Sequence, residues 1–152
     1  MIQGEPIVIL LAEDEPAHAE IIRRTMESLR VLNHMVHVED GQQALDYLYR
    51  RGRFADPATS PRPGLILLDL RMPRVDGLEV LKRIKADAQL LRIPTVILTT
   101  SATETDLVRA YDNHVNSYLV KPVDFSKFTA MMESFGYYWL MWNCSPEQRS
   151  AR

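Results

Sequence analysis

Leu65-Ile66-Leu67-Leu68-Asp69-Leu70 is an almost unbroken aliphatic run that carries a single carboxylate near its end. Continuous apolar residues, as opposed to alternating ones, are typical of a strand buried on both faces of a parallel sheet. Four further short runs along the chain read as strands: Ile7–Ala12, residues 35–38, Thr95–Thr99 and Ser117–Val120. Because an amphipathic stretch follows each run, the sequence predicts five strand–helix units.

The helices of these units are indicated by their starts and their apolar spacing. The first begins at Pro16, whose missing N–H would be unpaired at a helix start in any case. The others are marked by Ala44, Leu45 and Leu48; Leu78, Leu81 and Ile84; Leu107, Val108 and Tyr111; and Phe128, Met131, Met132 and Phe135. Right-handed crossovers favour a flavodoxin-like (βα)₅ fold of the α/β class, a doubly wound parallel sheet with strand order 2-1-3-4-5. Residues 52–63, with three prolines, are predicted to form a surface loop.

Composition narrows the range of functions. The 152 residues include 18 Lys and Arg against 20 Asp and Glu, a net charge of −2, so no basic field exists to hold a nucleic acid. No apolar run approaches the roughly 20 residues of a membrane span, and the N-terminus lacks the features of a secretory signal. The single cysteine, Cys144, excludes an internal disulfide. We therefore expect a soluble, cytoplasmic protein that binds neither nucleic acid nor membrane.

Acidic residues stand where the first and third strands end. Glu13 and Asp14 follow the first strand, and Asp69 closes the third. In an open α/β sheet of this order, these two strand ends meet at the switch point, where ligands bind. Neighbouring strands lie about 4.8 Å apart, so the carboxylates should converge and require either a cation or a shifted protonation state. An oxygen-only ligand set favours Mg²⁺.

The remaining strand ends add a hydroxyl and an ammonium group. Thr99 closes the fourth strand, and Lys121 follows the fifth. A carboxylate surrounded by a metal, a hydroxyl and a lysine suits the formation of an aspartyl phosphate, because the positive groups stabilise charge on the transferring oxygens.

Four motifs together carry a family resemblance: Leu11-Ala12-Glu13-Asp14, Leu67-Leu68-Asp69-Leu70-Arg71-Met72-Pro73-Arg74-Val75-Asp76-Gly77, Leu98-Thr99-Thr100-Ser101-Ala102 and Tyr118-Leu119-Val120-Lys121-Pro122. In order and placement they resemble those of response-regulator receiver domains, over about residues 7–135. The resemblance implies a phosphorylation switch served by a histidine kinase. It also implies a role for each matching residue: Asp69 as phosphoacceptor, Asp14 as a direct Mg²⁺ ligand, Glu13 as a ligand through water, Arg71 as a ligand through its carbonyl, Thr99 as switch hydroxyl, Lys121 as phosphoryl contact and Tyr118 as switch aromatic.

A narrower resemblance concerns the proline-rich loop and the C-terminal region. Both are similar to those of single-domain response regulators paired with phytochrome-type histidine kinases. Residues 135–142 are almost entirely apolar or aromatic, which favours an interface over one buried helix face. We expect a homodimer built on Tyr138, Trp139, Leu140 and Trp142. The predicted receiver domain, with an extended fifth helix, spans residues 1–143, and residues 144–152 are expected to be a flexible tail.

Three other functions compete with this interpretation. A haloacid-dehalogenase-type phosphohydrolase also uses a nucleophilic aspartate, but that family places a second Asp where Arg71 stands here. A flavin carrier would have a Ser/Thr/Gly-rich phosphate loop in place of Glu13-Asp14-Glu15. A phosphate-independent receiver-like scaffold stays open. No enzymatic turnover is expected beyond the chain's own phosphorylation and dephosphorylation, and the downstream target cannot be told from the sequence.

Overall fold

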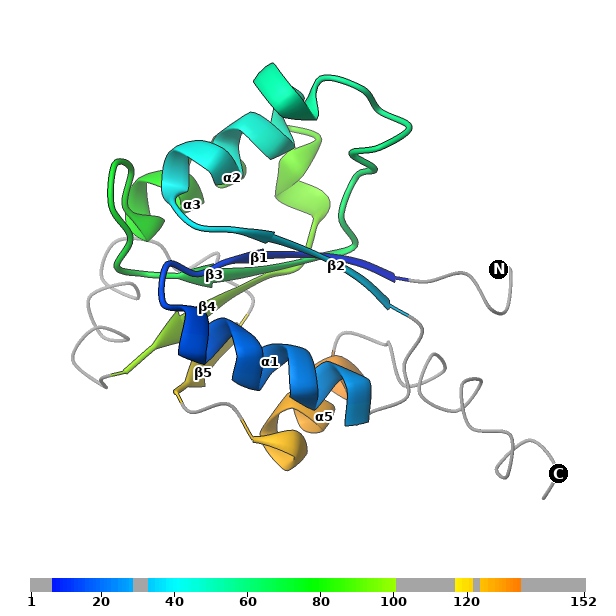
Figure 1. Ribbon diagram of the computed structural model, residues 1–152, viewed down its shortest axis with the longest axis vertical. Helices are drawn as coiled ribbons and strands as arrows, with labels where there is room; N and C mark the ends of the chain where they lie inside the picture. The colour runs from blue at the N-terminus through cyan, green and yellow to red at the C-terminus, as the bar shows by residue number, and fades with distance from the viewer. Residues whose placement is uncertain (1–6, 29–32, 101–116, 122–123, 135–152) are drawn as a thin grey trace, which may run out of the picture.

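A five-stranded parallel sheet forms the centre of the molecule. The computed structural model describes residues 7–28, 33–100, 117–121 and 124–134. Its strands are β1 (Ile7–Ala12), β2 (Asn33–Val38), β3 (Leu65–Asp69), β4 (Thr95–Thr99) and β5 (Ser117–Val120). They run in the order β2-β1-β3-β4-β5, all parallel (Figure 1), which confirms the predicted fold class and strand order.

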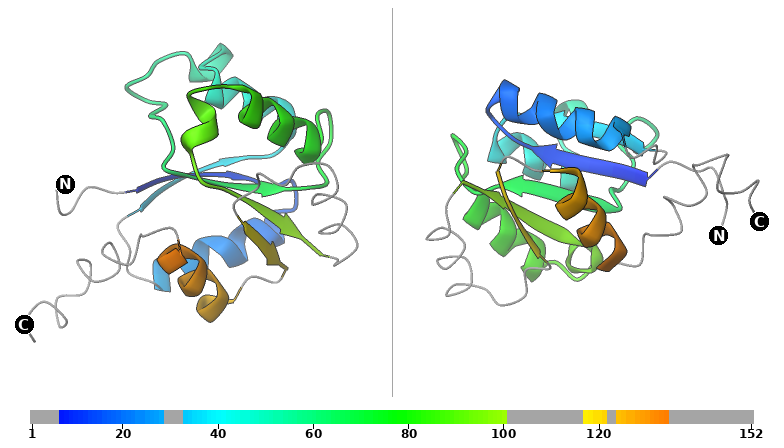
Figure 2. Two further views of the ribbon diagram at one scale, coloured as in Figure 1. Left: turned by 180° about the vertical axis from the view of Figure 1, so that it is seen from behind. Right: turned by 90° about the horizontal axis from the view of Figure 1, so that it is seen from below.

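Helices cover both faces of the sheet. The α-helices are α1 (Pro16–Ser28), α2 (Gly41–Leu48), α3 (Gly77–Ala86) and α5 (Phe125–Ser134), with 3-10 turns at Gly52–Phe54 and Leu90–Arg92. Helices α1 and α5 lie on one face and α2 and α3 on the other (Figures 1 and 2). The predicted helix around Leu107, Val108 and Tyr111 and the position of Phe135 fall outside the described residues. No helix in the described ranges is both long and apolar enough to cross a bilayer.

Alternation along the strands divides the core into two layers. Ile9, Leu11, Leu65, Leu67 and Leu119 pack with α1 and α5, whereas Leu10, Ala12, Ile66, Leu68 and Ile97 pack with α2 and α3. Successive side chains of a strand point to opposite faces, so each residue's place in the sequence fixes its layer. This alternation also decides where the polar residues beyond the strand ends come to lie.

Two elements differ in extent from their predicted bounds. Strand β2 begins at Asn33, two residues before the predicted start, and β3 ends at Asp69, one residue before the predicted end. The predicted surface loop 52–63 begins with a 3-10 turn, and the Tyr47 hydroxyl donates to the Pro61 carbonyl oxygen at 2.6 Å. That hydrogen bond pins the loop to the end of α2.

The start of α3 is held close to the end of β3. Asp76 caps the helix, its carboxylate accepting from the Glu79 N–H at 2.9 Å. A Cβ atom at Gly77 would collide with the carbonyl oxygen of Asp69. A glycine is therefore needed for α3 to begin beside the last residue of β3.

Candidate functional site

Strand register brings residues from three strand ends to one edge of the sheet. Ala12 is paired with Leu68, so the following residues, Glu13 and Asp69, are neighbours. The Glu13 N–H donates to Val38 at 3.0 Å and the Lys121 N–H donates to Thr99 at 2.7 Å, so β1 and β5 continue their pairing by one residue. The strand alternation therefore extends to the polar residues at this edge.

The same alternation places these groups on one face. Glu13 comes two residues after Leu11, Asp69 two after Leu67 and Lys121 two after Leu119, and all three leucines pack in the layer of α1 and α5. With a period of two along a strand, the acids and the lysine face that side as well. The charged cluster thus follows from strand register and pleat.

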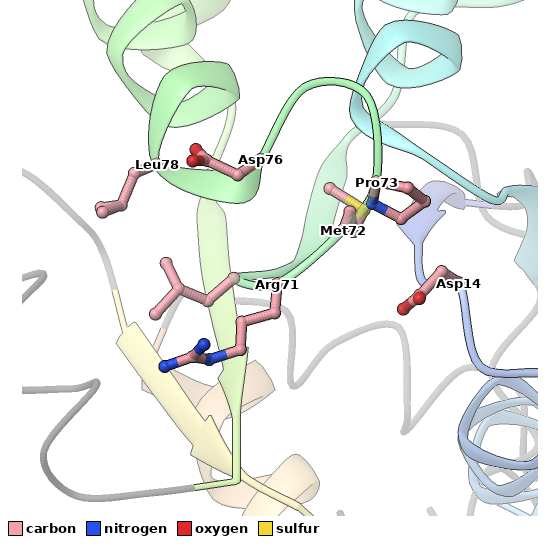
Figure 3. A pocket seen from close by; sticks show the side chains of 7 residues that line it. Asp14, Arg71, Met72, Pro73, Asp76 and Leu78 are labelled. Carbon is pink, nitrogen blue, oxygen red and sulfur yellow. The ribbon is translucent and has the colours of Figure 1, made fainter.

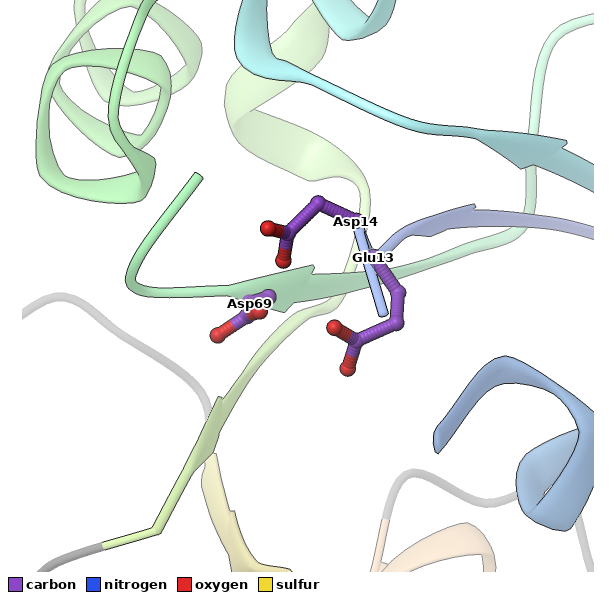
Figure 4. Close-up of side chains that lie close together, drawn as sticks. All are labelled: Glu13, Asp14 and Asp69. Carbon is purple, nitrogen blue, oxygen red and sulfur yellow. The ribbon is translucent and has the colours of Figure 1, made fainter. Parts of the chain in front are cut away.

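Three carboxylates share a small space at this edge. One oxygen each of Glu13, Asp14 and Asp69 lies within 4.8 Å of the others, and Figure 4 shows the three groups converging from the ends of β1 and β3. Glu13 and Asp69 are buried, whereas Asp14 is exposed. Oxygen ligands at this spacing suit a hard divalent cation, and the exposed carboxylate gives the ion access from solvent.

Lys121 is the cation of this cluster. Its Nζ lies 2.5 Å from Glu13 Oε1 and 3.3 Å from Asp69 Oδ2, and only 6% of its side chain is exposed. One ammonium group cannot balance three carboxylates, two of which are buried. The donor set therefore fits a bound divalent cation as the missing positive charge.

Among the residues of the site, Asp69 has a strongly shifted pKa. Burial and, after it, the neighbouring Glu13 carboxyl raise the pKa of the Asp69 carboxyl from 3.8 to about 6, against the opposing effects of Lys121 and the Arg71 N–H. That N–H donates to Asp69 Oδ1 at 3.2 Å. The ionised form is thus disfavoured in the metal-free protein, as expected for a carboxylate that awaits a positive partner.

A cavity of about 600 Å³ opens beside the acidic cluster. It is lined by Asp14, Leu70, Arg71, Met72, Pro73, Asp76 and Leu78. Figure 3 shows Asp14 across the cavity from the residues of the β3–α3 loop. The cavity therefore borders both the exposed Asp14 carboxylate and the loop that follows β3.

The two predicted switch residues lie on β4 and β5. Thr99 is buried at the end of β4 and is paired with Val120. Tyr118 is paired with Ile97 and packs partly buried against the α2–α3 core layer, opposite to the layer that Lys121 faces. Their roles in switching stay predictions, as does the metal contact through the Arg71 carbonyl. The predicted interface residues Tyr138, Trp139, Leu140 and Trp142 lie outside the described residues.

Sequence reasoning missed two histidines at this edge. His18 Nδ1 lies 3.2 Å from Lys121 Nζ, and His37 Nε2 bonds the Glu13 carbonyl oxygen at 2.7 Å. No local pattern points to the first contact, because 103 positions separate His18 from the lysine. The register of β2 against β1 could have suggested the second, since His37 is paired with Leu11.

Known proteins match this chain over most of its length. The family model for the response regulator receiver domain matches residues 9–133. The probable methanogenesis regulatory protein FilR2 of Methanothrix harundinacea is 47% identical over 142 residues, covering 93% of this chain and 89% of its own length. Response regulator Rcp1 of Synechocystis is 38% identical over 135 residues, covering 89% of this chain and 90% of its own length.

Solved structures give the same result. Bacteriophytochrome response regulator RtBRR superposes with a TM-score of 0.80 at 36% identity, over 97% of this chain and 95% of its own. The phosphorylated cyanobacterial phytochrome response regulator RcpA superposes with a TM-score of 0.73 at 39% identity, over 90% of this chain and 95% of its own. The Mn²⁺-bound form of Rcp1 superposes with a TM-score of 0.71 at 38% identity, over 89% of this chain and 95% of its own. The chain therefore belongs to the family of response regulator receiver domains, as its motifs predicted, and its relatives include phytochrome response regulators.

Proposed function

We propose that this chain is a single-domain response regulator in which Asp69 accepts a phosphoryl group from a sensor histidine kinase. The observation that carries the proposal is the juxtaposition of Asp69 with Glu13, Asp14 and Lys121 at one sheet edge. In the transfer, an Asp69 carboxylate oxygen bonds to phosphorus. The bond from phosphorus to the phosphohistidine nitrogen breaks, and the imidazole leaves with the electron pair.

The chain's own residues prepare this transfer. The Arg71 N–H orients the carboxylate through Oδ1, and Lys121 stands 3.3 Å from Oδ2, where its ammonium meets charge on the transferring oxygens. Asp14, Asp69, the Arg71 carbonyl and, through water, Glu13 would hold Mg²⁺. When bound, Mg²⁺ supplies the positive charge that three carboxylates and one lysine lack. That the similar protein Rcp1 has a Mn²⁺-bound form supports the binding of a divalent ion by this chain.

The acceptor is tested by incubation with acetyl phosphate and Mg²⁺ followed by intact-mass measurement. The wild type should gain the mass of one phosphoryl group, and Asp69→Asn should gain none. Asp87→Asn is a matched control, because Asp87 lies outside the cluster at the start of a 3-10 turn. Undiminished labelling of Asp69→Asn would rule out the assignment, and a wild type that never gains mass would favour the phosphate-independent scaffold.

The same assay addresses the enzymatic alternative. We infer that phosphate on Asp69 is a signal and that no external phosphoester is turned over, since the family consists of signalling switches. Steady release of p-nitrophenol from p-nitrophenyl phosphate, abolished by Asp69→Asn, would instead show a phosphohydrolase.

We infer that the input is a phytochrome-type kinase, because Rcp1-like regulators and bacteriophytochrome regulators are among the similar proteins. Transfer of radiolabelled phosphate from a purified phytochrome kinase, compared with a non-phytochrome histidine kinase, tests this input. The cytoplasmic location expected from the sequence stays a prediction.

We propose that phosphorylation changes partner binding through Thr99 and Tyr118. Phosphorylation should draw in the Thr99 hydroxyl and shift the Tyr118 ring, so that the surface near β5 and α5 changes its partner affinity. Thr99→Ala should still be phosphorylated but should lose the amide-exchange response in residues 117–121. An unchanged response would exclude this role.

Homodimerisation is proposed on the aromatic run of residues 137–142. Trp139→Glu should shift the protein toward monomer in sedimentation while leaving Asp69 labelling intact. A wild type that sediments only as a monomer at high micromolar concentration, with or without phosphate, would contradict this assembly.

A further inference from the structure

His18 lies in the first turns of α1, on the side from which that helix covers the charged edge of the sheet. Its Nδ1 is 3.2 Å from Lys121 Nζ and 3.8 Å from Glu13 Oε1. Its side chain is 38% exposed, so the other ring edge has access to solvent. No motif of the sequence assigns this residue a role.

The chemistry of the two groups fixes the direction of the hydrogen bond. A lysine ammonium group has three hydrogens and no acceptor, so Nδ1 must be the acceptor and the ring proton sits on Nε2. Lys121 Nζ is thus hydrogen-bonded to His18 Nδ1 and forms ion pairs with Glu13 Oε1 and Asp69 Oδ2.

Only one of these three acceptors changes during phosphorylation. When Asp69 becomes an acyl phosphate, its Oδ2 no longer carries the full charge that attracted the ammonium, and a phosphoryl oxygen takes over the contact. Glu13 and His18 form no new covalent bond in this step. The hydrogen bond to His18 and the ion pair with Glu13 can therefore hold the ammonium group in place while its contact with Asp69 passes from the carboxylate to the phosphoryl group.

We propose that His18 is a positioning residue whose hydrogen bond anchors the Lys121 ammonium so that it faces the phosphoryl group on Asp69. The inference rests on the proposed phosphorylation of Asp69. Without the His18 acceptor, the Glu13 ion pair would be the one contact of Lys121 given above that does not change during transfer, so the ammonium group could rotate about it and fewer lysine conformations would meet the transferring oxygens. His18 itself touches no reacting atom.

Three variants separate positioning from structural support. His18→Leu keeps a helix-favouring side chain of similar size but removes the acceptor. His18→Asn restores an acceptor, because the Asn Oδ1 atom occupies about the place of His Nδ1. His34→Leu is the control, since His34 is exposed on β2 in register with Val8, far along the strand from the site.

The measurement is the rate of phosphorylation by acetyl phosphate at saturating Mg²⁺, followed by intact mass over a range of donor concentrations. We expect His18→Leu to lower the maximal rate about tenfold, the size of one hydrogen bond to a charged group, with an unchanged half-saturating donor concentration. His18→Asn should recover most of the rate, and His34→Leu should match the wild type.

Two results would overturn the inference: a His18→Leu maximal rate equal to that of the wild type, or a His18→Asn rate as low as that of His18→Leu. In either case a normally labelled wild type would leave the proposed function of Asp69 standing. A wild type that gains no phosphoryl mass would instead overturn the proposed function itself.

Discussion

Aspartates in two regions of this molecule have side-chain pKa values that are shifted in opposite directions. At the starts of helices, Asp87 accepts from the N–H groups of Gln89 and Leu90, and Asp124 accepts from that of Lys127. These donors hold the pKa of both capping carboxyls below the ordinary value. At the strand ends, burial and Glu13 raise the pKa of Asp69 to about 6. Caps stabilise the ionised carboxylate, whereas the charged edge of the sheet disfavours it.

The contrast separates acids that serve the fold from acids that serve chemistry. A capping carboxylate is ionised in the folded chain and accepts hydrogen bonds from backbone N–H groups that have no acceptor within the helix. Asp69 has one backbone donor, the Arg71 N–H, and two neighbouring carboxylates. Its ionisation therefore costs free energy of folding until a cation arrives, and the following experiments test that difference.

The largest effect is expected from Asp14→Ala, which removes the exposed carboxylate of the cluster. Affinity for Mg²⁺ should fall on the order of 100-fold, because a lost carboxylate ligand costs at least as much as a lost outer-shell partner. Isothermal titration with Mg²⁺ measures it. Glu15→Ala is the matched control, one position further along and outside the cluster. An unchanged affinity in Asp14→Ala would mean that Asp14 does not bind the ion.

A smaller effect is expected on stability when Asp69 is replaced by Asn. The folded pKa is raised from 3.8 to about 6, so the native state holds the proton more tightly and metal-free stability falls as pH rises through that interval. Above it, Asp69→Asn should be more stable than the wild type by roughly 2 kcal/mol.

At pH 4 the two proteins should differ little, because the wild-type carboxyl is then protonated when folded. Urea unfolding in EDTA at both pH values measures this difference. Saturating Mg²⁺ should reverse the order by stabilising the wild type more. Equal stabilities at pH 8 without metal would contradict the cost assigned to Asp69.

The smallest effect is expected at a cap. Asp40 accepts from the Gln43 N–H at 2.8 Å and lies 3.6 Å from Arg74. Asp40→Ala should destabilise the protein by about 1 kcal/mol, whereas Asp40→Asn should cost much less, because asparagine caps as well as aspartate. Urea unfolding checks both variants. A loss in Asp40→Asn equal to that in Asp40→Ala would show that charge, and not the cap, is what Asp40 contributes.

Much of the fold could be predicted because the buried strands are recognisable in the sequence as runs of aliphatic residues. The start of β2 was missed, since Asn33 and His34 are polar. That strand lies at the edge of the sheet with one neighbour, where polar residues are tolerated. The cap at Asp40 carried a readable signal, a Gln three residues later, that the analysis of apolar spacing did not use.

At the site, position relative to the strand ends was enough to find Glu13, Asp14, Asp69 and Lys121. What the sequence could not supply was their pairing. Nothing in the local pattern indicates that Lys121 contacts Glu13 more closely than Asp69, or that His18 reaches the same ammonium group. Those contacts depend on how α1 packs over the sheet, a long-range outcome of core packing.

On this view, the site disfavours the ionisation of Asp69, and so raises the pKa of its carboxyl, until a cation binds. Titration of its carboxyl carbon by ¹³C NMR in the metal-free protein tests this most directly. The midpoint should lie at a pH of about 6, and saturating Mg²⁺ should move it sharply downward, since the ion stabilises the carboxylate. A metal-free midpoint near the ordinary value of 3.8, unmoved by Mg²⁺, would contradict the account.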